Sequence, residues 1–151
     1  MVKKVEHCQG SGCPIACTLD IIGDHWTLLV VREMMFAGNH QYKDMLTMEE
    51  GISSNILSDR LKRLEEHGII ASAYKQGNKR DKLYYLTQKG KNLIYVMIEI
   101  ARWAELNIGE KIHIPEEKRP LLDNPLQEVA EMVHKNLEAW EKKHLSEYMR
   151  I

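Results

Sequence analysis

The sequence has little of several features, and each shortage excludes a class of protein. Among 151 residues there are one Phe and four Pro, and Leu, Ile and Met supply most of the apolar side chains, which favours helices over a sandwich of strands. No run of about 18 uncharged apolar residues exists, so we expect no transmembrane helix. The opening residues lack the apolar stretch of a signal peptide, so we expect a cytoplasmic protein.

Cysteine and catalytic motifs are scarce as well. The three cysteines, Cys8, Cys13 and Cys17, all lie near the N-terminus, which is not the disulfide framework of a secreted domain. The sequence contains no Gly-rich phosphate loop, no nucleophile elbow and no evident pair of catalytic carboxylates. We therefore expect no enzyme, no catalytic residue and no cofactor.

Charge is nearly balanced over the whole chain, with a net value of −1, but it is unevenly distributed. Residues 51–100 hold 9 basic and 5 acidic side chains, a net charge of +4. Residues 1–50 hold 4 basic and 7 acidic side chains, and residues 101–151 hold 8 basic and 10 acidic ones. A local basic patch is what phosphate binding requires, so the middle third is the candidate nucleic-acid-binding part.

The pattern divides the chain into three parts. Residues 1–12 are polar and contain two glycines, and they predict a flexible arm. Residues 13–112 predict a series of helices with one hairpin, which is a mainly α fold with a small β-hairpin (α+β). Residues 113–151 predict a polar linker and a C-terminal helix, to which we assign dimerisation.

A short helix, a turn and a second amphipathic helix occupy the middle of the chain. Residues 42–47 predict the short helix, and Ser53 is a suitable N-cap for the second helix. In that helix Leu57, Leu61 and Leu64 fall at i, i+4 and i+7, so they form one stripe that faces the core. This order is typical of a helix-turn-helix.

A hairpin follows directly. Residues 69–75 and 82–86 suit extended chain, and residues 76–81 between them predict a loop that carries Lys79 and Arg80. A basic hairpin after a helix-turn-helix is the wing of a winged helix-turn-helix fold. Alone, the amphipathic helix is more often an ordinary surface helix, and the basic hairpin is more often a solvated loop. Together and in this order, they favour DNA binding.

The candidate DNA-binding residues follow from this arrangement. A helix that enters the major groove needs small polar side chains near its start to approach base edges, and basic side chains beside them reach phosphates. The predicted set is Ser53, Ser54, Asn55, Ser58, Arg60, Lys62, Lys79 and Arg80. Within it, Ser54, Asn55 and Ser58 are the candidates for bases.

Several stretches form a specific combination within residues 13–112. They are Cys13-Pro14, LDIIGDHWTLL from Leu19 to Leu29, Gly51-Ile52-Ser53, Leu57, Arg60-Leu61, Leu64-Glu65, HGII from His67 to Ile70, YLTQKG from Tyr85 to Gly90, and Trp103. Together they resemble the HxlR-type branch of the MarR-like winged helix-turn-helix transcriptional regulators. The resemblance implies a homodimer, with N- and C-terminal helices at the dimer interface, on a pseudo-palindromic operator, and repression as the sign of regulation.

The sequence departs from this family at two places. The family usually has a Pro-Pro wing where this chain has Gly77-Asn78-Lys79-Arg80-Asp81, and it usually has Arg-Phe where this chain has Gln41-Tyr42. The detailed DNA contacts are therefore expected to differ from those of the family.

The N-terminal cysteines leave alternatives open. Cys13 precedes Pro14 at a predicted helix start, where some relatives use a cysteine to sense oxidants or electrophiles, so Cys13 is the redox-sensing candidate with Cys8 or Cys17 as its resolving partner. A metal-responsive regulator is an alternative, but His7 and the three cysteines lack the paired spacing of a zinc site, so no metal ligand is assigned. A winged-helix protein-interaction module is the other alternative.

Overall fold

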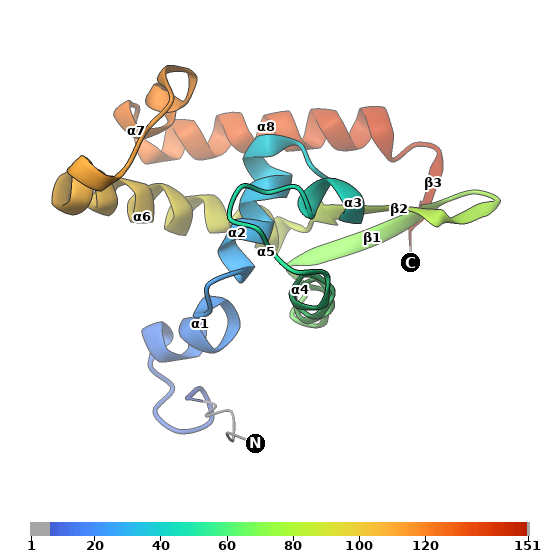
Figure 1. Cartoon of the computed structure of the whole chain (residues 1–151), viewed down its shortest axis with the longest axis horizontal. Coiled ribbons are helices and arrows are strands. Elements are labelled where there is room, and N and C mark those ends of the chain that lie inside the picture. The colour runs from blue at the N-terminus through green and yellow to red at the C-terminus, as the bar shows by residue number, and fades with distance from the viewer. Residues whose placement is uncertain (1–6, 151) are drawn as a thin grey trace.

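Helices form most of the structure, a computed structural model that describes residues 7–150 (Figure 1). In chain order the elements are α1 (Pro14–Ile22), α2 (Thr27–Arg32), the π-helix η1 (Glu33–Ala37), α3 (Tyr42–Met45), α4 (Ser54–Glu66), β1 (Ile70–Lys75), β2 (Asn78–Leu86), α5 (Gln88–Lys91), α6 (Leu93–Ile108), the 3₁₀-helices η2 (Gly109–Lys111) and η3 (Glu116–Lys118), α7 (Arg119–Asp123), α8 (Leu126–His144) and β3 (Tyr148–Arg150). The predicted mainly α fold with a β-hairpin is confirmed.

The main core lies where α2, α4, α6 and α8 meet β1. Val30 and Val31 in α2 are fully buried, and they pack in one cluster with the leucine stripe of α4 and with Ile94 of α6. In Figure 1, α6 and α8 run side by side and α2 approaches them from below. Burial of these side chains is the main stabilising contribution to the fold, since each fully buried aliphatic side chain contributes about 1.5–3 kcal/mol.

Helix α8 packs on its own chain. Val129, Ala130, Val133 and Leu137 are buried in the main core, as the pattern of this helix predicts. The apolar face of α8 is therefore occupied within the chain and is not available as a whole for a second subunit. The role of α8 in dimerisation stays a prediction. Among the described residues of α8, Met132 is the one large apolar side chain that is exposed.

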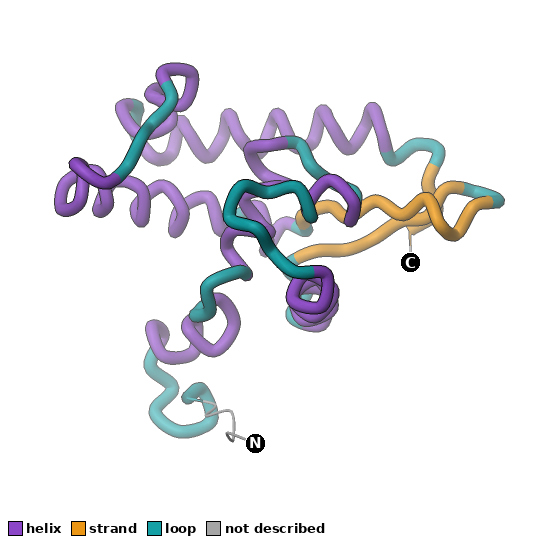
Figure 2. Tube along the Cα trace, viewed as in Figure 1, coloured by secondary structure: helices purple, strands orange, loops and turns teal. Residues whose placement is uncertain are grey.

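The sheet has three strands in the order β2-β1-β3 (Figure 2). Strands β1 and β2 form the predicted hairpin, with Ile70 opposite Leu86. Strand β3 pairs antiparallel with the other edge of β1 and was not predicted. The tip is also tighter than the predicted loop 76–81, because the chain turns at Gln76–Gly77, where Gly77 has φ +80°, and β2 already begins at Asn78.

Two predicted segments differ in detail. The apolar pattern after Thr87 predicts one long helix to about residue 108, but the chain breaks at Asn92 into α5 and α6. Thr87 does cap its helix, because its Oγ1 accepts from the N–H of Gly90 at 3.2 Å. The expected linker after residue 112 contains η3 and α7, and Leu121 and Leu122 of α7 pack against the core.

The predicted flexible arm is fastened to α1 over its second half, whereas residues 1–6 lie outside the described residues. Cys8 is disulfide-bonded to Cys17 of α1, and the backbone N–H groups of His7 and Cys8 donate to Asp20 at 2.8 and 3.0 Å. Within residues 7–150 no single helix has the length and hydropathy to cross a membrane. The pair α1 and α2–η1, bent by 74°, passes that test together by length and composition only.

Candidate nucleic-acid interface

The second helix of the helix-turn-helix, α4, begins as predicted. Ser53 caps it, since its Oγ accepts a hydrogen bond from the backbone N–H of Ile56 at 3.3 Å. Leu57, Leu61 and Leu64 are buried, and they fix one side of the helix to the core. The opposite side faces solvent, as a helix that enters a DNA groove requires.

The exposed side of α4 carries most of the predicted DNA-binding residues. Ser53, Ser54, Asn55, Ser58 and Lys62 are all exposed. Four of these side chains are short and polar, so the helix surface is low enough to approach base edges closely. The Ser53 oxygen is engaged as the cap, which leaves its hydroxyl proton for an acceptor.

Tyr42 joins the two helices of the motif, and sequence reasoning missed it as a site residue. Its hydroxyl donates to the backbone carbonyl of Ser54 at 3.0 Å and accepts from the hydroxyl of Ser58 at 3.2 Å. The signal in the sequence was Gln41-Tyr42 in place of Arg-Phe, because Phe has no hydroxyl for these bonds. Tyr42 therefore holds two of the predicted base-contacting serines relative to α3.

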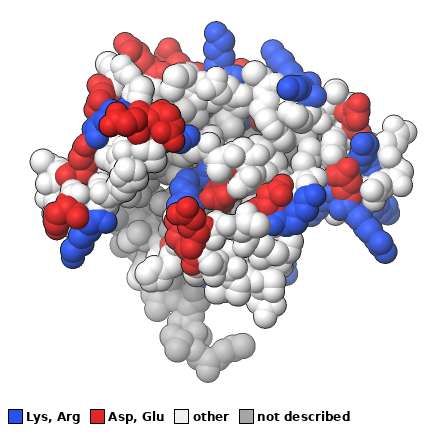
Figure 3. Space-filling model, turned by 45° about the horizontal axis from the view of Figure 1, so that its top comes forward, with Lys and Arg blue, Asp and Glu red and all other residues white. Residues whose placement is uncertain are grey.

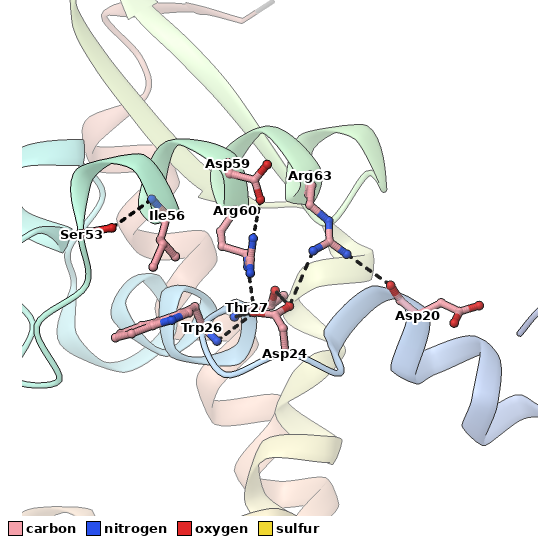
Figure 4. A network of polar contacts seen from close by, with 9 residues as sticks. All are labelled: Asp20, Asp24, Trp26, Thr27, Ser53, Ile56, Asp59, Arg60 and Arg63. Carbon is pink, nitrogen blue, oxygen red and sulfur yellow. Dashed lines mark hydrogen bonds and ion pairs between the residues drawn. The ribbon is translucent and has the colours of Figure 1, made fainter. Parts of the chain in front are cut away.

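Arg60, which was predicted to contact a phosphate, turns toward the start of α2 (Figure 4). Its Nε donates to Asp24 at 2.8 Å, its Nη1 is paired with Asp59, and its side chain is 19% exposed. The sequence pattern of α4 could not show that Arg60 pairs with Asp24, because Asp24 lies 36 residues earlier in the chain. Arg60 is thus part of the support of α4.

Asp24 is the centre of that support. Burial raises the pKa of its carboxyl, but hydrogen bonds from Thr27, Arg60 and the backbone N–H groups of Trp26 and Thr27 outweigh burial and hold the pKa well below its ordinary value. Asp24 precedes α2, whose N-cap is Trp26, and its Oδ1 accepts from the backbone N–H groups of Trp26 and Thr27 at 2.9 and 3.0 Å. Arg63 lies 3.9 Å from the same carboxylate, so Asp24 ties α4 to α2 at two points.

The wing carries its basic residues on a bulge. Tyr74 lies opposite Lys82, but the next residue, Lys75, lies opposite Asn78, so residues 79–81 have no cross-strand partner in β1 within the described register. Lys79 and Arg80, both predicted as phosphate contacts, are exposed there. Figure 3 shows Lys and Arg side chains projecting from the right-hand end of the molecule, where Figure 1 places the hairpin tip.

A cleft of about 540 Å³ separates the start of α3 from the wing. It is lined by Gln41, Tyr42, Lys43, Asn78, Arg80, Asp81, Lys82 and Tyr84. Three of these residues are basic and one is acidic, so the cleft suits an anionic ligand. Lys43, Lys82 and Tyr84 were not among the predicted site residues, because only the fold brings α3 next to β2.

Two of the N-terminal cysteines are disulfide-bonded and the third is a free thiol. Cys8 and Cys17 form a disulfide with Cα atoms 4.4 Å apart, and Cys13 is a free, partly exposed cysteine at the N-cap of α1. The disulfide removes two of the four ligands of the metal-responsive alternative. Among the described residues, no group of three His, Cys, Asp or Glu side chains is arranged to hold a metal ion.

A short helix, a turn, a capped helix with a polar face and a basic hairpin define a winged helix-turn-helix protein. The model of the HxlR-like helix-turn-helix family matches residues 21–112, and the chain belongs to this family. It is therefore a helix-turn-helix transcriptional regulator by family, which confirms the resemblance inferred from its motifs.

Named relatives and solved structures agree with this assignment. The chain is 36% identical over 101 residues to the uncharacterized HTH-type transcriptional regulator sll1512 of Synechocystis, covering 64% of this chain and 73% of the relative. It is 30% identical to the uncharacterized HTH-type transcriptional regulator YvaP of Bacillus subtilis, covering 64% of this chain and 89% of that protein. The crystal structure of PA1607, a candidate transcription factor, is similar with a TM-score of 0.59 and 34% identity over 74% of this chain and 73% of PA1607. The reduced form of the Bacillus subtilis transcriptional regulator YodB is similar with a TM-score of 0.52 and 27% identity, covering 63% of this chain and 93% of YodB.

Proposed function

We propose that the protein is a homodimeric repressor that binds a pseudo-palindromic DNA operator through α4 and the wing. The observation that carries this proposal is one continuous surface. Tyr42, Lys82 and Tyr84 line both the cleft beside the wing and a smaller hollow that Ser58 and Lys62 of α4 also line. A duplex laid on the polar face of α4 would therefore meet the basic wing at the same time.

The chemistry of each side chain on this surface determines whether we assign it to base edges or to phosphates. Ser54, Asn55 and Ser58 are short hydrogen-bonding groups at the exposed start of α4, so they are assigned to base edges. Lys62 and the wing residues Lys79 and Arg80 are basic and exposed, and they are assigned to phosphates, contacts that position the protein without reading the sequence. Repression is the sign that the family resemblance implies.

The second subunit is proposed to bind along α1 and α6. Ile15 and Leu19 of α1 are 72% and 55% exposed, and Trp103 and Leu106 of α6 are 61% and 84% exposed. A groove between the two helices, lined in part by Leu19 and Ile100, is almost wholly apolar. Exposed apolar side chains beside an apolar groove are typical of an interface with another protein, and a two-fold pseudo-palindrome calls for a second copy.

The test is a fluorescence-anisotropy titration of the full chain with duplex DNA from its own promoter region. We expect tight binding that competitor DNA of scrambled sequence does not displace, with an affinity that falls steeply as salt increases. Binding of both DNAs with equal affinity would contradict sequence-specific recognition. No binding at low salt would favour the alternative, a winged-helix module that binds protein.

We also propose that modification of Cys13 by an oxidant or electrophile alters operator affinity. Its free thiol lies at the start of α1, next to the proposed dimer surface. Cys8 and Cys17 are already bonded to one another, so neither is a free resolving partner for Cys13, contrary to the expectation from the sequence. A quinone adds to a free thiol without a second thiol, and it should lower the operator affinity of the parent protein and leave the Cys13→Ser variant unchanged. A Cys13→Ser variant that still responds to the quinone would show that Cys13 is not the sensor.

A further inference from the structure

We propose that the C-terminal residues 145–150 are a positioning element that holds the basic bulge of the wing in place for DNA. This inference rests on the DNA-binding function proposed above. The matched family region ends at residue 112, so the segment lies outside it. In Figure 1, β3 lies against the hairpin close to its tip, at the far end of the chain from α1.

The bulge needs support from outside the hairpin. Within the described register, residues 79–81 are skipped by the pairing of β1 with β2, so the ladder does not fix their backbone. One internal bond is present, since the N–H of Arg80 donates to Asn78 Oδ1 at 3.0 Å. A bulge held only at its base leaves its two basic side chains mobile, which costs conformational entropy when they bind phosphates.

Asp81 supplies the outside support. Its Oδ1 accepts a hydrogen bond from the hydroxyl of Tyr148 at 2.9 Å and another from Gln41 Nε2 at 3.2 Å. Tyr148 belongs to β3 and Gln41 precedes α3, so one carboxylate oxygen joins the wing to the C-terminal strand and to the helix-turn-helix. Because Asp81 adjoins Arg80, fixing Asp81 also fixes where Arg80 leaves the wing.

Backbone pairing and a small second core hold Tyr148 in position. Tyr148 lies opposite Lys75, and the two residues that follow it lie opposite Tyr74 and Ala73. Leu145 is buried with Ala73 and Leu83 in a small cluster that is separate from the main core. Tyr148 packs against this small cluster. The C-terminal segment therefore braces the hairpin through both its backbone and its side chains.

Two substitutions of Asp81 separate positioning from electrostatics. Asp81→Ala and Asp81→Asn remove the same negative charge next to the DNA, but only Asn keeps an oxygen that accepts from Tyr148 and Gln41. We expect Asp81→Ala to bind operator DNA about three- to ten-fold more weakly than Asp81→Asn, the range that one or two hydrogen bonds account for. Equal affinities of the two variants would overturn the inference.

A second pair tests the C-terminal partner of Asp81. Tyr148→Phe removes the hydroxyl that reaches Asp81 and keeps the ring, so we expect a loss of affinity in the same direction. Tyr95→Phe is the matched control, because the Tyr95 hydroxyl bonds Gln127 at 3.2 Å, a contact between α6 and α8. An equal effect of the two variants would contradict a role specific to the wing.

A double-mutant cycle gives a readout that a merely structural role would not change. If the bulge is loosened, Arg80→Ala should cost less affinity in the Asp81→Ala background than in the Asp81→Asn background. Hydrogen exchange of the amides of residues 76–82 gives a readout without DNA, and it should be faster in Asp81→Ala than in Asp81→Asn. Failure of the parent protein to bind DNA would refute the proposed function. Equal hydrogen-exchange rates in Asp81→Ala and Asp81→Asn would refute the positioning role alone and leave the proposed function intact.

Discussion

The indole ring of Trp140 stacks on the imidazole ring of His40, with ring centroids 3.5 Å apart and planes inclined by 15°. His40 lies two residues before the first residue of α3, and its Nδ1 is 2.8 Å from the carbonyl oxygen of Tyr84 in β2. His144 also stacks on Trp140, with ring centroids 5.0 Å apart. Through this one contact α8, the wing and the helix-turn-helix meet, so the protonation of His40 bears on all three.

Acid should destabilise the protein through His40. Burial lowers the pKa of His40 from 6.5 to about 4, the hydrogen bond with Tyr84 opposes this, and the nearby His144 lowers the pKa further. The unfolded chain therefore takes up this proton at a higher pH than the folded chain. The contribution of His40 to the free energy of unfolding is present above pH 6.5 and is lost as the pH falls toward 4, by about 3 kcal/mol at most.

Urea denaturation at pH 7.5 and at pH 5 measures this effect. The His40→Phe variant keeps an aromatic ring on Trp140 but cannot be protonated, so it should lose less stability than the parent between these two pH values. His113→Phe is the control, because His113 is an exposed histidine outside the contact with Trp140. If the parent and His40→Phe lose the same stability, His40 is not the group responsible.

Arg60 and Lys62 form a matched pair on α4 with opposite expected effects. Arg60 is bonded to Asp24 at 2.8 Å, whereas Lys62 is exposed on the face proposed to meet DNA. Arg60→Ala should lower the free energy of unfolding by about 1–3 kcal/mol, because it leaves Asp24 short of a charged partner. Lys62→Ala should leave stability unchanged and reduce the slope of log affinity against log salt by about 1.

Denaturation and anisotropy at a series of salt concentrations separate the two effects. The assignment fails if Arg60→Ala leaves stability intact and reduces the salt slope as much as Lys62→Ala does. That result would return Arg60 to the phosphate contacts that the sequence predicted.

How much could be predicted from the sequence depends on the range of each interaction. Ser53 and the leucine stripe of α4 were predictable, because capping and helical periodicity act within one to three turns. The partner of Arg60 and the strand β3 were not predictable, since Asp24 and Tyr148 reach their contacts only after α2 and α8 have packed. A three-residue strand also has too few positions to show an alternating pattern.

The proposed dimer surface makes Leu106→Glu a dissociating variant. Leu106 is 84% exposed on α6, and a carboxylate buried between two subunits without a partner is costly. We expect the dimer dissociation constant to rise at least about ten-fold, measured by analytical ultracentrifugation, with a parallel loss of operator affinity. Met132→Glu on α8 is the comparison, since Met132 is 44% exposed.

Comparing Leu106→Glu with Met132→Glu shows whether the dimer interface lies on α6 or on α8. A loss limited to Leu106→Glu would place the interface on α6 and leave α8 outside it. An equal loss in Met132→Glu would support the part in dimerisation that the sequence pattern assigned to the C-terminal helix.

Lys91 and Glu141 join α5 to α8 by an ion pair of 2.8 Å, with the Lys91 side chain only 7% exposed. Removing one partner of such a pair leaves the other charge without compensation, so Lys91→Met should lower the free energy of unfolding by about 3 kcal/mol. Replacing both by apolar side chains removes both desolvation penalties, so Lys91→Met combined with Glu141→Leu should recover most of that loss. Urea denaturation of the two single variants and the double variant completes the cycle. Strictly additive losses would show that the two charges do not stabilise one another, and α8 would then be held by its apolar face alone.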